Sequence, residues 1–141
     1  MDLQLTIGQA SGPVRLWTEF SPNAIAVLTR GLPVAGDLTH CKWSGSACFI
    51  TLPTDPFAEV AEHEYPAITL YPGTLALRLT DPFAPNPELL ISYGQSEHRW
   101  PEGPKAVTPI GEIVGNVDEL FAALSSCATT GQTPFQLSPK G

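Results

Sequence analysis

Basic residues are scarce in this sequence. Seven lysines and arginines stand against 14 aspartates and glutamates, which gives a formal net charge of -7, and the basic residues are scattered singly. Such a charge balance repels the phosphate backbone of nucleic acids and anionic membrane surfaces. We therefore expect no nucleic-acid or membrane partner, although a single arginine inside a pocket can still bind one carboxylate.

Long apolar runs and paired cysteines are also missing. No window approaches the ~18 consecutive apolar residues that would span a bilayer. The N-terminus opens with an acid and alternates polar with apolar residues, whereas a signal peptide begins with basic residues and a continuous apolar run. The three cysteines, Cys41, Cys48 and Cys127, are odd in number and have no CxxC spacing. These features predict a cytoplasmic protein with reduced thiols and neither metal nor cofactor.

Strand-like segments dominate the chain. Leu3, Leu5 and Ile7 alternate with polar residues, and a second alternating segment follows at residues 14–20 after a glycine-containing turn. Short runs separated by Gly or Pro predict further strands at residues 38–43, 47–52, 67–71, 74–79, 89–93, 107–114 and 132–137. Residues 81–87 and 95–105 read as loops.

Two short helices are expected. Ser21 and Pro22 supply an N-cap and a first-turn proline for a helix over residues 22–30, which Gly31 ends. Asn116 or Asp118 caps a second helix that contains Leu120 and Leu124 at helical spacing. Many short strands, only two helices and no regular alternation between them predict a mainly β protein, an antiparallel barrel or sandwich. A length of 141 residues predicts a single domain over residues 1–141.

The densest chemistry lies at residues 39–45. His40, Cys41, Trp43 and Ser44 bring an imidazole, a thiol, an indole and a hydroxyl close together, but they match no metal, phosphate or nucleophile motif. His40 could act as a general base, or it could simply hydrogen-bond a neighbour. Ser44 lacks the G-x-S-x-G elbow of a nucleophile and also reads as a turn residue.

Aromatic residues and one arginine complete the candidate site. Gly45 and Gly94 closely follow Trp43 and Tyr93, and a glycine backbone lets a ligand approach an aromatic wall. In the polar segment at residues 95–100, Arg99 could hold a substrate carboxylate, or its charge could be satisfied by its neighbours.

The order of several short motifs resembles that of bacterial cyclophilin-like proteins, specifically a family labelled only as a domain of unknown function. The motifs are Glu19-Phe20-Ser21-Pro22, Leu32-Pro33, His40 with Trp43-Ser44-Gly45, Tyr71-Pro72-Gly73, Tyr93-Gly94 and Ile110-Gly111-Glu112-Ile113-Val114-Gly115. This resemblance covers nearly the whole chain. It implies a closed antiparallel barrel of about eight strands with a helix at each open end.

The resemblance also bears on chemistry. True cyclophilins isomerise X-Pro bonds with a Phe-Met-x-Gln stretch, which is missing here because the only methionine is Met1. Prolyl isomerase activity is therefore not expected. Other cyclophilin-like domains occur in subunits of bacterial enzymes that open or carboxylate cyclic amides, such as relatives of 5-oxoprolinase and allophanate hydrolase.

We therefore expect a small organic ligand, a carboxylate or a cyclic amide, in a groove on the barrel. The residues expected to line this groove are His40, Trp43, Ser44, Tyr71, Tyr93 and Arg99. Two alternatives stay open. The chain could be a non-catalytic interaction module, as a homo-oligomer or an accessory subunit of an amide hydrolase, or it could itself hydrolyse a cyclic amide.

Overall fold

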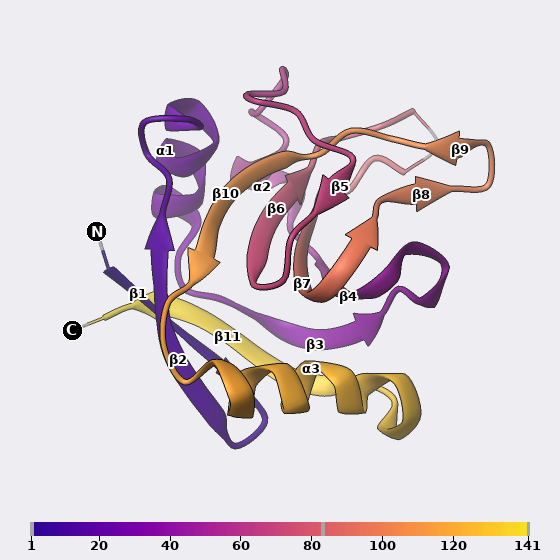
Figure 1. Cartoon of the computed structure of the whole chain (residues 1–141). Coiled ribbons are helices and arrows are strands. Elements are labelled where there is room, and N and C mark those ends of the chain that lie inside the picture. The colour runs from indigo at the N-terminus through magenta and orange to yellow at the C-terminus, as the bar shows by residue number, and fades with distance from the viewer. Residues whose placement is uncertain (1, 83, 141) are drawn as a thin grey trace.

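Eight antiparallel strands close into a barrel in the computed structural model, which describes residues 2–82 and 84–140 (Figure 1). Their order is β4-β3-β11-β1-β2-β10-β6-β7, and β7 pairs back with β4. The barrel strands are β1 (Asp2–Ile7), β2 (Ala10–Leu16), β3 (Val34–His40), β4 (Gly45–Thr51), β6 (Thr74–Arg78), β7 (Glu88–Glu97), β10 (Thr108–Ile113) and β11 (Thr133–Pro139). The fold class predicted from the sequence is confirmed.

Alternating residues fill the barrel. Leu3, Leu5 and Ile7 of β1 are fully buried, as their alternation with polar residues predicts. Apolar side chains from the other strands meet them in one continuous core. Burial of this apolar surface is the main force that closes the barrel.

Helices lie at the two ends of the barrel. The helices are α1 (Pro22–Gly31), the short α2 (Thr54–Phe57), the 3₁₀ turn η1 (Lys42–Ser44) and α3 (Val117–Thr130). Figure 1 shows α1 and α3 at opposite ends, and Leu120 and Leu124 of α3 join the main core. The two predicted helices are confirmed, and α2 is an addition that the sequence did not predict. None of the helices in the described part of the chain is long and apolar enough to cross a membrane.

Several predicted segment boundaries are wrong. The second strand, expected at residues 14–20, covers Ala10–Leu16, because its pairing with β1 begins at Ala10, directly after a turn of two residues. The strand expected at residues 38–43 ends at His40, because the chain turns through η1 and places Trp43 outside the barrel wall. Residues 95–105 were expected to form a loop, but β7 runs on to Glu97 because β5 (Thr69–Leu70) pairs with its end. The short strands β8 (Arg99–Trp100) and β9 (Gly103–Pro104) then form a hairpin.

The start of α1 is capped from a distant segment. The hydroxyl of Ser21, the expected N-cap, instead donates to the carbonyl of Pro109 at 2.6 Å. The Glu64 carboxylate accepts from the backbone N–H groups of Asn23 at 3.2 Å and Ala24 at 2.8 Å. These are two of the donors that a helix start leaves unpaired, and a negative charge there is also favoured by the helix dipole.

Removal of this cap should weaken the fold. We expect Glu64→Ala to lower the free energy of unfolding by about 1 kcal/mol, the usual value for the loss of an N-cap. Glu62→Ala, a change at an exposed neighbour, is the matched control and should cost less than about 0.5 kcal/mol. Urea unfolding of both variants checks this, and equal midpoints would contradict the role of Glu64.

Candidate functional site

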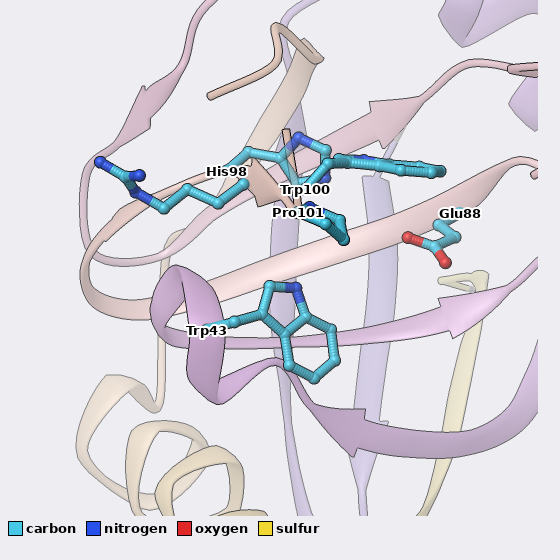
Figure 2. Close-up of a pocket in the computed structure, with 6 residues that line it drawn as sticks. Trp43, Glu88, His98, Trp100 and Pro101 are labelled. Atoms are coloured by element: carbon cyan, nitrogen blue, oxygen red, sulfur yellow. The ribbon is translucent and has the colours of Figure 1, made fainter. Parts of the chain in front are cut away.

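A groove with a volume of about 520 Å³ lies on the outer face of the barrel. A second apolar cluster lies apart from the main core, and Phe49, which contacts Trp43, packs against it. Its members are Cys41, Ala47, Leu70, Ala76, Leu90 and Val107. Glu88 lies on the same outward face of β7 as Leu90. The residues that line the groove are Trp43, Glu88, His98, Arg99, Trp100 and Pro101 (Figure 2).

Trp43 forms one wall of the groove. Its side chain belongs to η1, is 60% exposed and meets the ring of Phe49 in an edge-to-face contact at 6.0 Å. The hydroxyl of Ser44 accepts a hydrogen bond from the backbone N–H of Arg99 at 3.1 Å. This bond ties η1 to β8, so Ser44 fixes the distance between the wall that carries Trp43 and the wall that carries Trp100.

Trp100 forms the opposite wall, as Figure 2 shows. The Arg78 guanidinium carbon lies 5.1 Å from the Trp100 ring centroid, and the Lys105 ammonium lies 4.7 Å from it. Arg78 and Lys105 line a neighbouring cavity of about 160 Å³ that shares Trp100 with the groove. These cation–π contacts hold the indole in place.

Glu88 supplies the negative charge of the groove. Its Oε1 lies 3.1 Å from Nε of Arg78, and its side chain is 22% exposed. The N–H at Nε of Arg78 does not point at Oε1 well enough for a hydrogen bond, so Arg78 and Glu88 form an ion pair only. The other guanidinium nitrogens of Arg78 donate to the carbonyls of Leu79, Ala84 and Asn86. The two terminal nitrogens of Arg78 are therefore engaged by carbonyls, whereas Glu88 keeps acceptor capacity for a ligand.

His98 is the only histidine that lines the groove in the described part of the chain, and it is 4% exposed. Its Nδ1 lies 3.0 Å from the carbonyl oxygen of Lys105, so Nδ1 must carry the proton that it donates. The neutral ring then has its lone pair at Nε2. Nε2 has no hydrogen-bond partner among the described residues and is not fully enclosed by protein, and His98 lines the groove.

Burial keeps His98 neutral. It lowers the pKa of the ring below its ordinary value of 6.5, and the charges of Arg78 and Lys105 lower it further. The hydrogen bond to Lys105 and the charge of Glu88 act in the opposite direction and raise it. The pKa of His40, which is also buried, is lowered by desolvation and by the charge of Lys42.

These lowered pKa values make stability depend on pH. Below about pH 6.5 the unfolded chain binds protons that the folded histidines do not, so stability is complete above that pH and falls as the pH decreases. We expect the melting temperature to drop between about pH 7.5 and about pH 5.5. The drop should be smaller in His98→Asn, and a melting temperature that rises on acidification would contradict the neutral histidines.

A family model described as a protein of unknown function, DUF3830, matches residues 3–139. The chain belongs to this family. The unknown-function family expected from the sequence motifs is thereby confirmed. A comparison with curated proteins finds no match.

Two solved structures share the DUF3830 chain's fold. McbB, solved in complex with tryptophan, is similar with a TM-score of 0.77 at 20% identity, over 99% of this chain and 45% of McbB. The hypothetical protein AF2241 from Archaeoglobus fulgidus has a TM-score of 0.62 at 16% identity, over 99% of this chain and 95% of its own. The DUF3830 chain thus spans less than half the length of McbB, and at these identities the likeness shows the fold alone.

The six residues expected to line one groove do not share it. Trp43 and Arg99 line it, and the Arg99 guanidinium pairs with Glu97 at 2.8 Å. Ser44 supports the groove through its bond to β8 and lines a polar depression beside it. Tyr71 is 77% exposed and is not a lining residue, because the turn that contains it points the side chain to solvent.

His40 and Tyr93 form a separate pair. Nε2 of His40 lies 2.6 Å from the Tyr93 hydroxyl, and the rings meet edge to face at 5.6 Å. Both lie on the inward face of the barrel. His40 shares a face of β3 with buried Leu38, and Tyr93 packs against the main core. His40 Nδ1 is buried and has no partner among the described residues. The strand alternation, which turns His40 away from Trp43, explains why the sequence motif does not form one site.

Four groove residues were not predicted as site residues. His98 and Trp100 belong to the polar segment at residues 95–100, so their position beside Arg99 was the one signal that could have found them. Pro101 continues the same hairpin. Glu88 lies directly before a strand-like run in the sequence. It reaches the groove only because β7 pairs with β4 and β6, and the sequence does not reveal this pairing.

The cysteines are poor candidates for nucleophiles. All three are buried free thiols. Burial raises the pKa of Cys41 to about 12, and desolvation together with neighbouring Cys127 raises that of Cys48 still further. The reactive thiolate is therefore scarce at neutral pH. Among residues 2–82 and 84–140, no cluster of three or more His, Cys, Asp or Glu side chains is placed to hold a metal ion.

Proposed function

We propose that the groove binds a small organic molecule with a flat ring, and that a cyclic amide fits it better than a simple carboxylate. The observation that carries this proposal is the pair of indoles, Trp43 and Trp100, on opposite sides of a cavity with Glu88 between them (Figure 2). A cavity of about 520 Å³ has the size of a small-molecule site.

The two indoles favour a planar ligand. Trp43 is 60% exposed and meets Phe49 edge to face, and Trp100 is held by its cation–π contacts with Arg78 and Lys105. Stacked or edge-to-face aromatic contacts contribute about 0.5–1.5 kcal/mol each beyond the burial of area. A flat ring between the walls would gain this twice without a change in the barrel.

The charges of the groove separate the two ligand classes expected from the sequence. A carboxylate would meet the negative charge of Glu88, while Arg78 is already engaged by three carbonyls and Arg99 by Glu97. The N–H of a cyclic amide can instead donate to the free carboxylate oxygen of Glu88. Hydrogen bonds to a charged acceptor are about twice as strong as neutral ones.

McbB, a protein of this fold, was solved with tryptophan bound. The likeness to this chain is one of fold, so the site of that ligand does not transfer. Tryptophan nevertheless carries a flat indole, which suits the two aromatic walls, and an ammonium group, which can donate to the Glu88 carboxylate. Tryptophan therefore belongs in the set of compounds to be tested.

A thermal-shift screen tests the proposal. The compounds are 5-phenylhydantoin as a cyclic amide without a carboxylate, 5-oxoproline as a cyclic amide that carries one, tryptophan, and aromatic and aliphatic carboxylates. A ligand that binds only the folded state raises the melting temperature, by an amount that grows with its concentration. We expect the cyclic amides that carry an aromatic ring to give the largest shift. No shift from any class would overturn the proposal and favour an interaction module, whose homo-oligomer or partner subunit sedimentation analysis would then reveal.

A further inference from the structure

We infer that the groove does more than bind: the geometry points to His98 as a base that removes a proton from the carbon beside the carbonyl of a bound cyclic amide. This inference rests on the proposed function, because it requires the ligand to occupy the groove. It assigns a catalytic residue and a reaction, proton exchange at an acidic C–H bond.

The tautomer of His98 is fixed by the fold. Nδ1 donates to the Lys105 carbonyl at 3.0 Å, which leaves the lone pair at Nε2. Lys105 lies just beyond β9, so the β8–β9 hairpin carries both the imidazole and the carbonyl that orients it. A base held in one orientation by a second group is the usual arrangement of a catalytic histidine.

Nε2 is the part of His98 that the protein leaves unused. The residue is only 4% exposed, and Nε2 has no partner among the described residues, yet Nε2 is not fully enclosed and the residue lines the groove. Buried polar groups normally have a hydrogen-bond partner, and none of the described residues supplies one for Nε2. Its lone pair can accept a proton from a molecule bound in the groove.

Glu88 can stabilise the positive charge that His98 would gain when it accepts a proton. The protonated imidazolium would interact favourably with the Glu88 carboxylate, which acts on His98 across the groove. The groups that face His98 with the opposite effect are Arg78 and Lys105. They keep the resting ring neutral, which is the form that accepts a proton.

The step is a simple proton transfer. Nε2 takes the proton, the C–H bond breaks, and its electron pair delocalises into the neighbouring carbonyl of the ligand to form an enolate. The imidazolium exchanges its proton with solvent through the open groove and returns a proton to the carbon. No oxidant, reductant or second substrate is consumed, and return to the other face of the ring inverts that carbon.

The test uses 5-phenylhydantoin, a cyclic amide with a flat aromatic ring and one acidic C–H bond next to a carbonyl. In deuterium oxide, the wild-type protein should speed loss of the NMR signal of that proton above the rate with buffer alone. His98→Asn can keep the hydrogen bond to the Lys105 carbonyl while it removes Nε2. We expect this variant to lower the protein-dependent rate by about 100-fold or more, the usual contribution of a positioned base, with the ligand Kd changed less than about 3-fold.

His63→Asn is the matched control, because His63 also bonds through Nδ1, to the Thr108 hydroxyl at 3.0 Å, but does not line the groove. Its exchange rate should equal that of wild type. Binding without exchange, or exchange that survives in His98→Asn, would overturn the inference while the proposed binding function stands. No binding at all would overturn both.

If His98→Asn does not fold, the pH profile of the wild-type exchange rate tests whether His98 is the base. The protein-dependent rate should rise with pH as His98 loses its proton and then level off. A protein-dependent rate whose rise is centred above about pH 6.5 would overturn the assignment of His98 as the base, because burial lowers the pKa of this ring below its ordinary value.

Discussion

Replacement of Arg78 by methionine should lower the free energy of unfolding by about 3–5 kcal/mol, the cost of breaking a buried ion pair from one side. Arg78 is 4% exposed and donates to the carbonyls of Leu79, Ala84 and Asn86 at 2.9, 3.1 and 2.6 Å. The variant removes the side-chain donor from the carbonyls of Leu79 and Asn86 and leaves the charge of Glu88 uncompensated, while the carbonyl of Ala84 keeps the backbone N–H of Asp81 at 3.2 Å. Since the Arg78 guanidinium also packs on Trp100, the wall of the groove should loosen as well.

An exposed ion pair supplies the control for Arg78. Arg15 and Glu112 lie 3.7 Å apart, and their side chains are 68% and 40% exposed. Arg15→Met should change stability by no more than about 0.5 kcal/mol, since solvent screens such pairs. Urea unfolding measures both variants, and a cost for Arg78→Met as small as that for Arg15→Met would show that the buried network stabilises nothing.

Trp43→Ala should weaken binding of 5-phenylhydantoin by about 30-fold, which corresponds to about 2 kcal/mol. Trp43 is 60% exposed in the unliganded protein, so its removal costs the fold little, whereas it takes away one of the two walls. The loss should therefore appear in the Kd measured by calorimetry, with the melting temperature of the free protein almost unchanged.

Tyr71→Ala is the matched control for Trp43→Ala. Tyr71 is also a large exposed aromatic residue, at 77%, but it does not line the groove. Its removal should leave the Kd within about 2-fold of wild type, as for a residue outside the contact. Equal losses in both variants would mean that the ligand binds through general surface hydrophobicity.

Much of the barrel could be predicted from the sequence. The alternation of Leu3, Leu5 and Ile7 identifies a strand because a period of two is a local property, and the proline and glycine at the ends of α1 mark its boundaries in the same way. The N-cap of α1 could not be assigned locally. Ser21 has the right side chain for an N-cap, but its hydroxyl donates to the carbonyl of Pro109 instead. The helix is capped by the carboxylate of Glu64, 40 positions after Ala24.

The site was harder to predict than the fold. Proximity in sequence placed His40, Trp43 and Ser44 together, but the turn through η1 sends Trp43 outside while His40 stays on the inward face. Glu88 and Trp43 are 45 positions apart in the sequence and meet only because β4 pairs with β7. Such neighbours depend on the register of distant strands, which no local pattern contains.

The indole N–H signals of the three tryptophans give the most direct test of a ligand site in this groove. Trp43 and Trp100 line the groove, whereas Trp17 lies at a separate apolar depression with Phe20, Tyr65 and Pro109. In a titration with 5-phenylhydantoin followed by ¹H–¹⁵N NMR, the signals of Trp43 and Trp100 should move together with one Kd while that of Trp17 stays still. A shift of Trp17 alone, or no shift at a concentration that saturates the thermal response, would contradict binding between the two indoles.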